Sequence, residues 1–200
     1  MFIGRDKELK TLENLYKKDS FEFAVIYGRR RVGKTTLIKE FIKDKKAIFY
    51  PGIDSNETQN LELFSNSIMS AVSEMNTGTV FKDFSSAFDY IYELAQKERI
   101  VLVIDEYPYL ANCYKGISSL LASFIDHKFL TSNLMLILCG SSLSFMENQV
   151  LGYQSPLYGR RTAQICLKQI PFKYYREFFP DRTEQECIEM YSITGGVPNI

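Results

Sequence analysis

The sequence has little of several residue types on which common active sites depend. Histidine occurs once in 200 residues, at His127, which excludes histidine-based triads and multi-histidine metal sites. The cysteines Cys113, Cys139, Cys166 and Cys187 are widely spaced and form no CxxC pair. This spacing indicates neither a zinc site nor a disulfide framework. We expect buried free thiols in a reducing compartment.

Long apolar runs and an excess of charge of either sign are also absent. The N-terminus becomes polar after three residues, and no stretch has the length of a membrane span or a secretory leader. We therefore expect a cytoplasmic protein with no membrane partner. Lys plus Arg and Asp plus Glu total 24 each, which excludes a generally basic chain that binds nucleic acid by overall charge, though not a local basic patch.

The most informative feature that is present is a glycine-rich loop between an apolar run, 23–27, and a helix-like run, 36–42. Two glycines, four intervening residues and Gly-Lys-Thr form the pattern of a phosphate-binding loop. The glycines let successive N–H groups surround phosphate oxygens, and the following helix directs its positive end at the same anion. The predicted nucleotide-binding residues are Gly28, Arg29, Arg30, Arg31, Val32, Gly33, Lys34, Thr35 and Thr36.

Four side chains are predicted to carry the chemistry on ATP and Mg²⁺. Lys34 provides a mobile charge for the β- and γ-phosphates, and the Thr35 hydroxyl is a magnesium ligand. Asp105 ends the apolar run 100–105, where a buried strand would deliver it beside the phosphate loop as a second metal ligand. Glu106 follows directly and is predicted to orient or deprotonate the attacking water.

The alternation of apolar runs with helix-period segments predicts an α/β fold with a central parallel sheet of about five strands, flanked by helices. Because one strand separates the phosphate loop from Asp105, we expect strand 134–140 to insert between theirs, giving the order 5-1-4-3-2. That order is typical of ATPases with an added strand and a catalytic glutamate, rather than small-molecule kinases. The predicted strands are 22–27, 47–51, 100–105, 134–140 and 163–169; the predicted helices are 6–18, 34–43, 57–75, 84–98, 116–128, 143–149, 171–178 and 183–193, with a surface loop at 76–83.

Strand 134–140 ends in a polar tip that should face the γ-phosphate. Ser142, in preference to Ser141, is predicted to sense the loss of that phosphate. The alternative is that Ser142 or Ser144 caps the next helix, because Ser144 and Glu147 have the spacing of a capping box.

Four segments together resemble the archaeal-type ATPases of the AAA+ and signal-transducing ATPase clan. They are Phe2–Leu9 (FIGRDKEL), Tyr27–Thr35 (YGRRRVGKT), Ile104–Leu110 (IDEYPYL) and Gly195–Pro198 (GGVP). The resemblance implies that Phe2, Ile3 and Gly4 line the base pocket. It also implies that the Gly-Gly-x-Pro turn begins a helical lid, with Gly196 and Pro198 near the nucleotide. We expect an ATPase core over 1–180 and the start of a truncated lid module over 181–200.

Several arginines and aromatic residues allow more than one interpretation. Arg29, Arg30 and Arg31 are interpreted as solvated charges that offset the nucleotide, in preference to a DNA contact. Arg160 and Arg161 precede the last strand and either reach the γ-phosphate of a neighbouring subunit or form an ordinary exposed pair. The aromatic residues of 172–179 are expected to pack rather than to stack on bases.

The sequence thus predicts an ATPase that hydrolyses Mg–ATP to rearrange a C-terminal effector region. One alternative is a slow nucleotide-gated switch, and another is a DNA-associated ATPase that contacts DNA through that C-terminal region. Glu106 favours turnover over switching, and the even charge balance disfavours DNA binding. The absence of an Asn-Lys-x-Asp run favours adenine over guanine. A homo-oligomer is compatible with the arginine pair.

Overall fold

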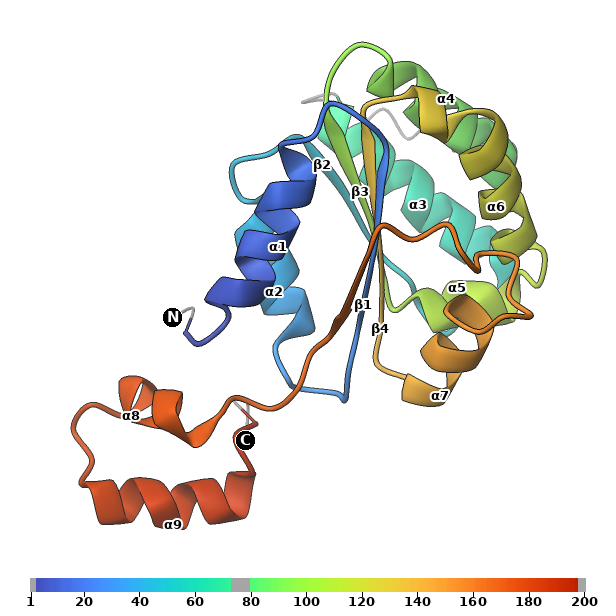
Figure 1. Ribbon diagram of the computed structural model, residues 1–200. Helices are drawn as coiled ribbons and strands as arrows, with labels where there is room; N and C mark the ends of the chain where they lie inside the picture. Colours follow the sequence, from blue (N-terminus) through green and yellow to red (C-terminus); the bar gives the residue numbers. More distant parts are fainter. Residues whose placement is uncertain (1–2, 73–79, 198–200) are drawn as a thin grey trace.

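The protein is a three-layer α/β domain with a small helical pair beside it (Figure 1). The computed structural model describes residues 3–72 and 80–197. The strands are β1 (Glu22–Tyr27), β2 (Ala47–Pro51), β3 (Ile100–Asp105), β4 (Leu134–Gly140) and β5 (Ala163–Cys166). The helices are α1 (Asp6–Tyr16), α2 (Lys34–Ile42), α3 (Glu57–Val72), α4 (Phe84–Ala95), α5 (Tyr107–Cys113), α6 (Ile117–His127), α7 (Leu143–Phe145), α8 (Tyr175–Phe178) and α9 (Glu184–Thr194), with short helical turns η1 (Phe129–Thr131), η2 (Met146–Val150) and η3 (Phe172–Tyr174).

All five strands are parallel and follow the order β2-β3-β4-β1-β5. Read from the β5 edge, this is the predicted order 5-1-4-3-2. β4 lies between β1 and β3, and it pairs Tyr27 of β1 with Gly140. The carboxyl ends of β1, β3 and β4 therefore meet at one edge of the sheet, where ligands bind in open α/β folds.

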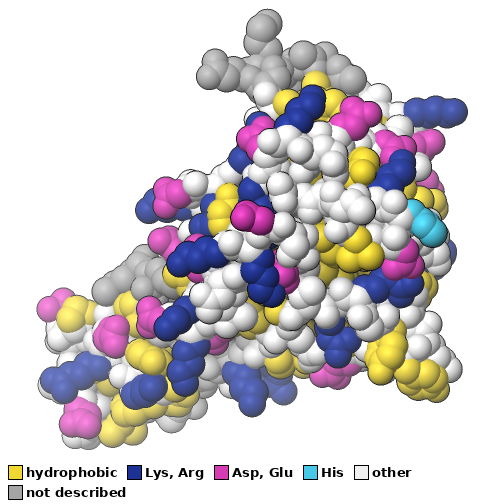
Figure 2. Space-filling view, turned by 45° about the horizontal axis from the view of Figure 1, so that its top comes forward, with side chains coloured by type: hydrophobic (Ala, Val, Ile, Leu, Met, Phe, Trp, Pro, Cys, Tyr) yellow, Lys and Arg dark blue, Asp and Glu magenta, His cyan; other side chains and the backbone are white. Residues whose placement is uncertain are grey.

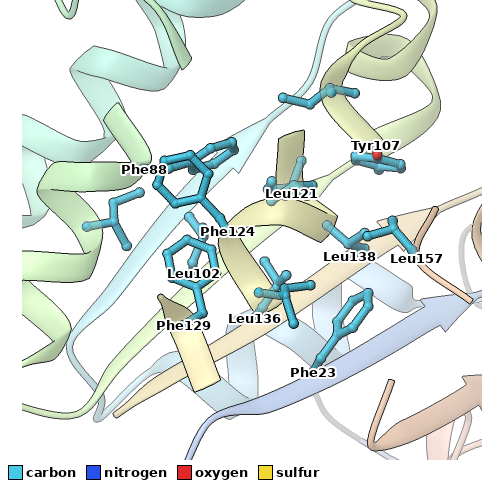
Figure 3. Packing of buried hydrophobic residues seen from close by; sticks show 14 of the residues in the cluster. Phe23, Phe88, Leu102, Tyr107, Leu121, Phe124, Phe129, Leu136, Leu138 and Leu157 are labelled. Carbon is cyan, nitrogen blue, oxygen red and sulfur yellow. The ribbon is translucent and has the colours of Figure 1, made fainter. Parts of the chain in front are cut away.

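The residues of the central strands alternate between two hydrophobic clusters, because successive side chains of a strand point to opposite faces. Phe23 and Val25 face the layer of α3 to α6, while Ala24 and Ile26 face α1 and α2. Figure 3 shows the first cluster, in which Phe88 from α4 and its aromatic neighbours lie over β3 and β4. Both faces of the central strands are covered, so β4 and the interiors of β1 and β3 are apolar.

Most predicted helices and strands are confirmed. The differences concern short elements near the carboxyl ends of the strands. β5 ends at Cys166 rather than at residue 169, because its partner β1 ends at Tyr27, whose carbonyl accepts the Leu167 N–H. The helix α5 was not predicted; it starts straight after β3, with Pro108 in its first turn, where a missing N–H costs nothing. The predicted helix 143–149 divides into α7 and η2. Part of the predicted loop 76–83 and the end of helix 57–75 lie outside the described residues.

The chain after β5 forms a helical pair of η3 with α8 against α9, which projects from the domain (Figure 1). Tyr175 lies at the centre of the contact, with its ring 5.2 Å from that of Tyr191 and 5.1 Å from that of Phe179. The expected packing role of these aromatic residues is confirmed. The pair begins at Phe172, so a division after residue 180 would pass through it.

Candidate functional site

The loop between β1 and α2 has the backbone that a phosphate cradle needs. Gly28 has φ +155°, and a Cβ there would collide with the Leu167 carbonyl. Gly33 has φ +93°, and Arg31 has φ +65°, in the left-handed region that few side chains adopt. The positive φ values of Gly28, Arg31 and Gly33 give the loop the kind of turn in which successive N–H groups can face an anion.

Lys34 is buried at the first position of α2, and its side chain folds back onto its own loop. Its Nζ donates to the carbonyls of Gly28 at 2.9 Å and Arg29 at 3.0 Å. A buried ammonium needs such acceptors to compensate its loss of hydration. The ammonium is thus held at the centre of the loop, where phosphate oxygens would compete for it.

Thr35 and Asp105 come from different elements and meet beside Lys34. The Thr35 Oγ1 donates to Asp105 Oδ2 at 2.8 Å. The other carboxylate oxygen, Asp105 Oδ1, accepts the Glu106 N–H at 3.0 Å, which fixes the orientation of the carboxylate. Asp105 is only 6% exposed. The hydroxyl and the carboxylate are the two predicted magnesium ligands, and the fold brings them together.

These donors fit a magnesium ion that is also bound by phosphates and water. Mg²⁺ prefers oxygen ligands and in nucleotide sites usually takes only one or two from the protein. Thr35 Oγ1 and Asp105 Oδ2 supply that number. Among the described residues there is no group of three or more His, Cys, Asp or Glu side chains that could hold a metal. The residues therefore suit an ion that arrives with a nucleotide, and not a closed structural metal site.

Glu106 contacts Ser141 and not Ser142. The Ser141 hydroxyl lies 2.8 Å from Glu106 Oε1 and 2.9 Å from Oε2, and the Ser141 N–H donates to Oε2 at 3.3 Å. Ser142 is exposed and stands at the N-cap of α7, with no cap bond from its side chain to the described residues. The predicted capping box of Ser144 with Glu147 does not form, because Ser144 already lies inside α7. For the sensing role, the sequence predicted Ser142 in preference to Ser141, but the geometry favours Ser141.

The N-terminal segment lies against the chain that leaves β5. Ile3 is buried, and a Cβ on Gly4, which has φ +69°, would come within 2.9 Å of the Tyr174 ring. Between this segment and 166–174 is a cavity of about 280 Å³, and a second cavity of about 200 Å³ extends from there to Gly28. Phe2 and Pro198 lie outside the described residues. The described part of the expected base pocket is thus adjacent to the phosphate loop.

Gly196 follows α9 instead of preceding the helical pair. Its N-terminal neighbour Gly195 ends α9 with φ +60°, and the Gly196 carbonyl accepts the Ile170 N–H at 3.0 Å. Residues 167–171, which we call the strap, connect β5 to the helical pair. The bond from Gly196 therefore joins the end of α9 to this strap. The helical lid that the resemblance places after this turn stays a prediction, because the described residues end at 197.

The three loop arginines are exposed, as expected, and so is Thr36 at the start of α2. Arg30 donates to the Tyr109 hydroxyl of α5 at 3.1 Å, which joins the tip of the phosphate loop to the helix after Glu106. Figure 2 shows the molecule with the top of the Figure 1 view turned toward the reader. On this face, basic and acidic side chains are interspersed.

Arg160 and Arg161 lie near the amino ends of the strands, whereas the phosphate loop lies at their carboxyl ends. They precede β5, and the next residue, Thr162, pairs with Phe23 near the start of β1. Arg160 forms a two-pronged pair with Asp126 of α6, with Nε to Oδ1 at 2.8 Å and Nη2 to Oδ2 at 2.6 Å. This guanidinium lowers the pKa of Asp126. Neither arginine contacts the site of its own chain.

The cysteines are all free, but not all are buried. Cys139 is buried beside Asp105, and burial raises the pKa of its thiol well above the ordinary value. Cys187 is also buried, and Cys113 is half-buried. Cys166 is exposed and lines both cavities, so the expectation of a buried thiol is wrong there. The reason is that β5 is an edge strand whose alternate side chains face outward.

Arg5 is a site residue that the sequence pattern did not single out. It is 5% exposed, and its Nη2 donates to the Val32 carbonyl at 2.9 Å and to the Lys168 carbonyl at 2.5 Å. Burial lowers the pKa of its guanidinium. Its place in the segment Phe2–Leu9, which resembles a nucleotide-binding motif, was the available signal.

The profile of a family described as an ATPase domain predominantly from Archaea matches residues 2–200. An uncharacterized protein of Methanocaldococcus jannaschii is 32% identical over 198 residues, which is 99% of this chain and 43% of the relative. The chain thus spans less than half the length of that curated relative.

Two solved structures share the fold. The Walker-type ATPase of Pyrococcus abyssi superposes with a TM-score of 0.69 and 21% identity, over 97% of this chain and 64% of that one. A signal transduction ATPase with numerous domains and a tetratricopeptide repeat sensor, from Pyrococcus horikoshii, gives a TM-score of 0.56 and 21% identity, over 98% of this chain and 28% of that one. Within the described part of this chain, no helix has the length and apolar character to span a membrane.

Proposed function

Because the chain belongs to the family of ATPase domains found predominantly in Archaea, we propose that it binds and hydrolyses Mg–ATP. We further propose that the cycle rearranges a C-terminal effector region. The observation that carries the proposal is the meeting of Thr35 Oγ1 and Asp105 Oδ2 at 2.8 Å, next to the buried Lys34. A hydroxyl, a carboxylate and an ammonium at the end of a glycine loop suit a polyphosphate with a divalent cation.

Each residue has a distinct task in this proposal. Lys34 leaves the carbonyls of Gly28 and Arg29 and binds phosphate oxygens, while the loop N–H groups hold the same anion. Thr35 and Asp105 hold the magnesium ion, which compensates the charge of the β- and γ-phosphates when bound.

Glu106 is the proposed base for the attacking water. For that task its carboxylate must exchange its hydrogen bonds with Ser141 for one with water, because both carboxylate oxygens now accept from that serine. Ser141 then becomes free to contact the γ-phosphate. We therefore assign the sensing role to Ser141.

One observation favours the slow switch as a second candidate. Both carboxylate oxygens of Glu106 accept hydrogen bonds from Ser141, so neither is free to take a proton from the attacking water. While Ser141 holds Glu106 in this way, a bound nucleotide would be hydrolysed slowly. The signal-transducing type of the Pyrococcus horikoshii protein is compatible with such a switch.

The remaining proposals concern partners. A homo-oligomer with shared active sites would need Arg160 or Arg161 to reach a neighbour's nucleotide. A DNA contact is proposed through the C-terminal region, and one by this domain would need a basic surface such as the exposed Arg29–Arg31. The pair of Arg160 with Asp126 weakens the case for a shared site, and the equal totals of basic and acidic residues, 24 each, weaken the case for DNA binding. A cytoplasmic location remains a proposal as well.

The test compares two variants by calorimetry and by steady-state turnover. Lys34→Ala should weaken ATP binding severely, since the charge that faces two phosphates is lost. Glu106→Gln should keep ATP binding and lower turnover by about a hundredfold or more, because an amide is no base. Lys39→Ala is the matched control, an exposed lysine on the same helix.

Near-normal ATP affinity in Lys34→Ala would contradict the phosphate-loop assignment. Equal turnover in Glu106→Gln and the parent would remove Glu106 from the mechanism. A parent that binds ATP tightly and shows no turnover would place the switch first.

A further inference from the structure

The end of the phosphate loop is tied to a distant strap of chain by one buried guanidinium. The two hydrogens of Arg5 Nη2 serve two acceptors, the Val32 carbonyl and the Lys168 carbonyl. Val32 stands two residues before Lys34, and Lys168 stands in the strap between β5 and the helical pair. Arg5 therefore joins segments that are more than 130 residues apart in the sequence.

The same strap also touches the beginning of the phosphate loop. Leu167 donates its N–H to the Tyr27 carbonyl, and its own carbonyl lies so close to Gly28 that no side chain fits there. The strap thus contacts the loop at Gly28 directly and at Val32 through Arg5. A shift of the strap would change the loop at both ends.

The strap leads directly into the helical pair, and hydrogen bonds join the two. Ile170 N–H bonds the Gly196 carbonyl, and the Ile170 carbonyl accepts from the Tyr191 hydroxyl at 3.1 Å. Tyr174 of η3 packs on Gly4, next to Arg5. The helical pair, the strap and the N-terminal segment therefore form one connected set of contacts around the loop.

Arginine suits this position better than lysine. Its planar guanidinium presents donors in fixed directions, so one nitrogen can serve two carbonyls while Nη1 reaches Glu8 at 3.4 Å. A buried charge with these partners is retained only if its contacts compensate its desolvation. Hydrogen bonds from a charged donor are the stronger kind, so their loss should be measurable.

We infer that Arg5 is a positioning residue that couples the phosphate loop to the helical pair by bridging the Val32 and Lys168 carbonyls. This inference rests on the proposed nucleotide site. Its consequence is that nucleotide binding in the loop stabilises the α8–α9 pair, and that the position of the pair sets the affinity for nucleotide, since coupling between sites is reciprocal.

The experiment compares Arg5→Met with Arg99→Met in the full chain. Arg99 is a matched control because it also donates to two carbonyls, those of Ser20 and Leu15, but at the far end of α1. The measurements are thermal stability, ADP affinity by calorimetry, and amide hydrogen exchange of 172–194 with and without saturating ADP. Both variants should lose stability, because each loses two bonds from a charged donor to backbone carbonyls, and Arg5→Met also loses the bond to Glu8.

Only the Arg5 variant should bind ADP more weakly and lose the protection of 172–194 by ADP. We expect ADP affinity to fall roughly 10- to 100-fold, the range of one or two charged hydrogen bonds. At saturating ADP, the nucleotide should no longer slow exchange in 172–194 of Arg5→Met, whereas Arg99→Met should keep this protection. Arg5→Lys retains the charge without the fork and should fall between the parent and Arg5→Met.

Arg5→Lys carries the test if Arg5→Met does not fold. An Arg5 variant with the parent's ADP affinity and the parent's protection of 172–194 would overturn the inference, as would an equal loss of affinity in Arg99→Met. A parent that does not bind ADP overturns the proposed function, and the inference with it. ADP binding by the parent is measured before any variant is made. Failure of the proposed function is therefore distinguishable from failure of the inference.

Discussion

The Ser141 hydroxyl lies within 2.9 Å of both carboxylate oxygens of Glu106, at the carboxyl ends of the adjacent strands β4 and β3. Glu106 itself has φ +49°, a left-handed conformation that is uncommon for a residue with a side chain. Such strain persists only where the surroundings enforce it. Here β3, the first turn of α5 and Ser141 together hold the carboxylate in place.

Ser141→Ala should lower turnover by about tenfold or more while ATP affinity changes little, because the residue that positions Glu106, and that we propose to contact the γ-phosphate, loses its hydroxyl. Ser142→Ala is the matched control, and we expect it to resemble the parent. Steady-state rates and calorimetric affinities of the two variants decide the matter. A larger loss in Ser142→Ala would restore the original preference for that serine, and faster turnover in Ser141→Ala would favour the switch.

Asp105→Asn should chiefly damage magnesium dependence. The amide can still meet Thr35 and the Glu106 N–H, but it lacks the charge that a hard cation prefers. We expect the magnesium concentration for half-maximal activity to rise by about tenfold or more. A magnesium titration of ATPase activity measures this, with the exposed Asp54→Asn as control. An unchanged titration curve would argue against a metal ligand at Asp105.

Arg160 and Arg161 give opposite expectations for a shared site and for a surface pair. If either reaches a neighbour, activity per subunit should rise with protein concentration, since assembly completes the site. Mixing the double variant Arg160→Ala, Arg161→Ala with Glu106→Gln should then restore activity, because one mixed interface joins two intact halves. Activity that is independent of concentration, with no rescue, would leave Arg160 as the partner of Asp126 alone.

The N-cap of α4 predicts a pH-dependent contribution to stability. The Asp83 carboxylate accepts the Ser86 N–H at 2.7 Å, and this bond lowers the Asp83 pKa below its ordinary value of 3.8. A lowered folded pKa means that the contribution is complete above about pH 3.8 and is lost as pH falls through the folded pKa. Asp83→Ala should therefore cost about 1 kcal/mol at pH 7 and less below pH 4.

Urea unfolding of the parent and Asp83→Ala across this pH range measures the difference. Asp83→Asn is the control, because asparagine caps a helix about as well without a titrating group. A parent-to-alanine difference that stays constant as the pH falls well below 3.8 would contradict the role of the carboxylate.

Much of the architecture was predictable because it depends on local patterns. Continuous apolar runs located β3 and β4 to the residue, and the glycine-lysine-threonine pattern located the loop. The single strand between the loop and Asp105 led to the observed strand order. Short elements such as α5 were missed, since seven residues carry too little periodicity to distinguish a helix from a turn.

By itself, the sequence determined the parts of the proposed nucleotide site: the loop of Gly28 to Thr35, and two carboxylates at the end of a buried strand. Only the tertiary structure decided which of two adjacent serines meets Glu106, that Cys166 faces outward, and that Arg5 bridges Val32 and Lys168. The physical reason is range. Glycine freedom and strand hydrophobicity act within a few residues, whereas these three outcomes depend on which segments the parallel sheet brings side by side.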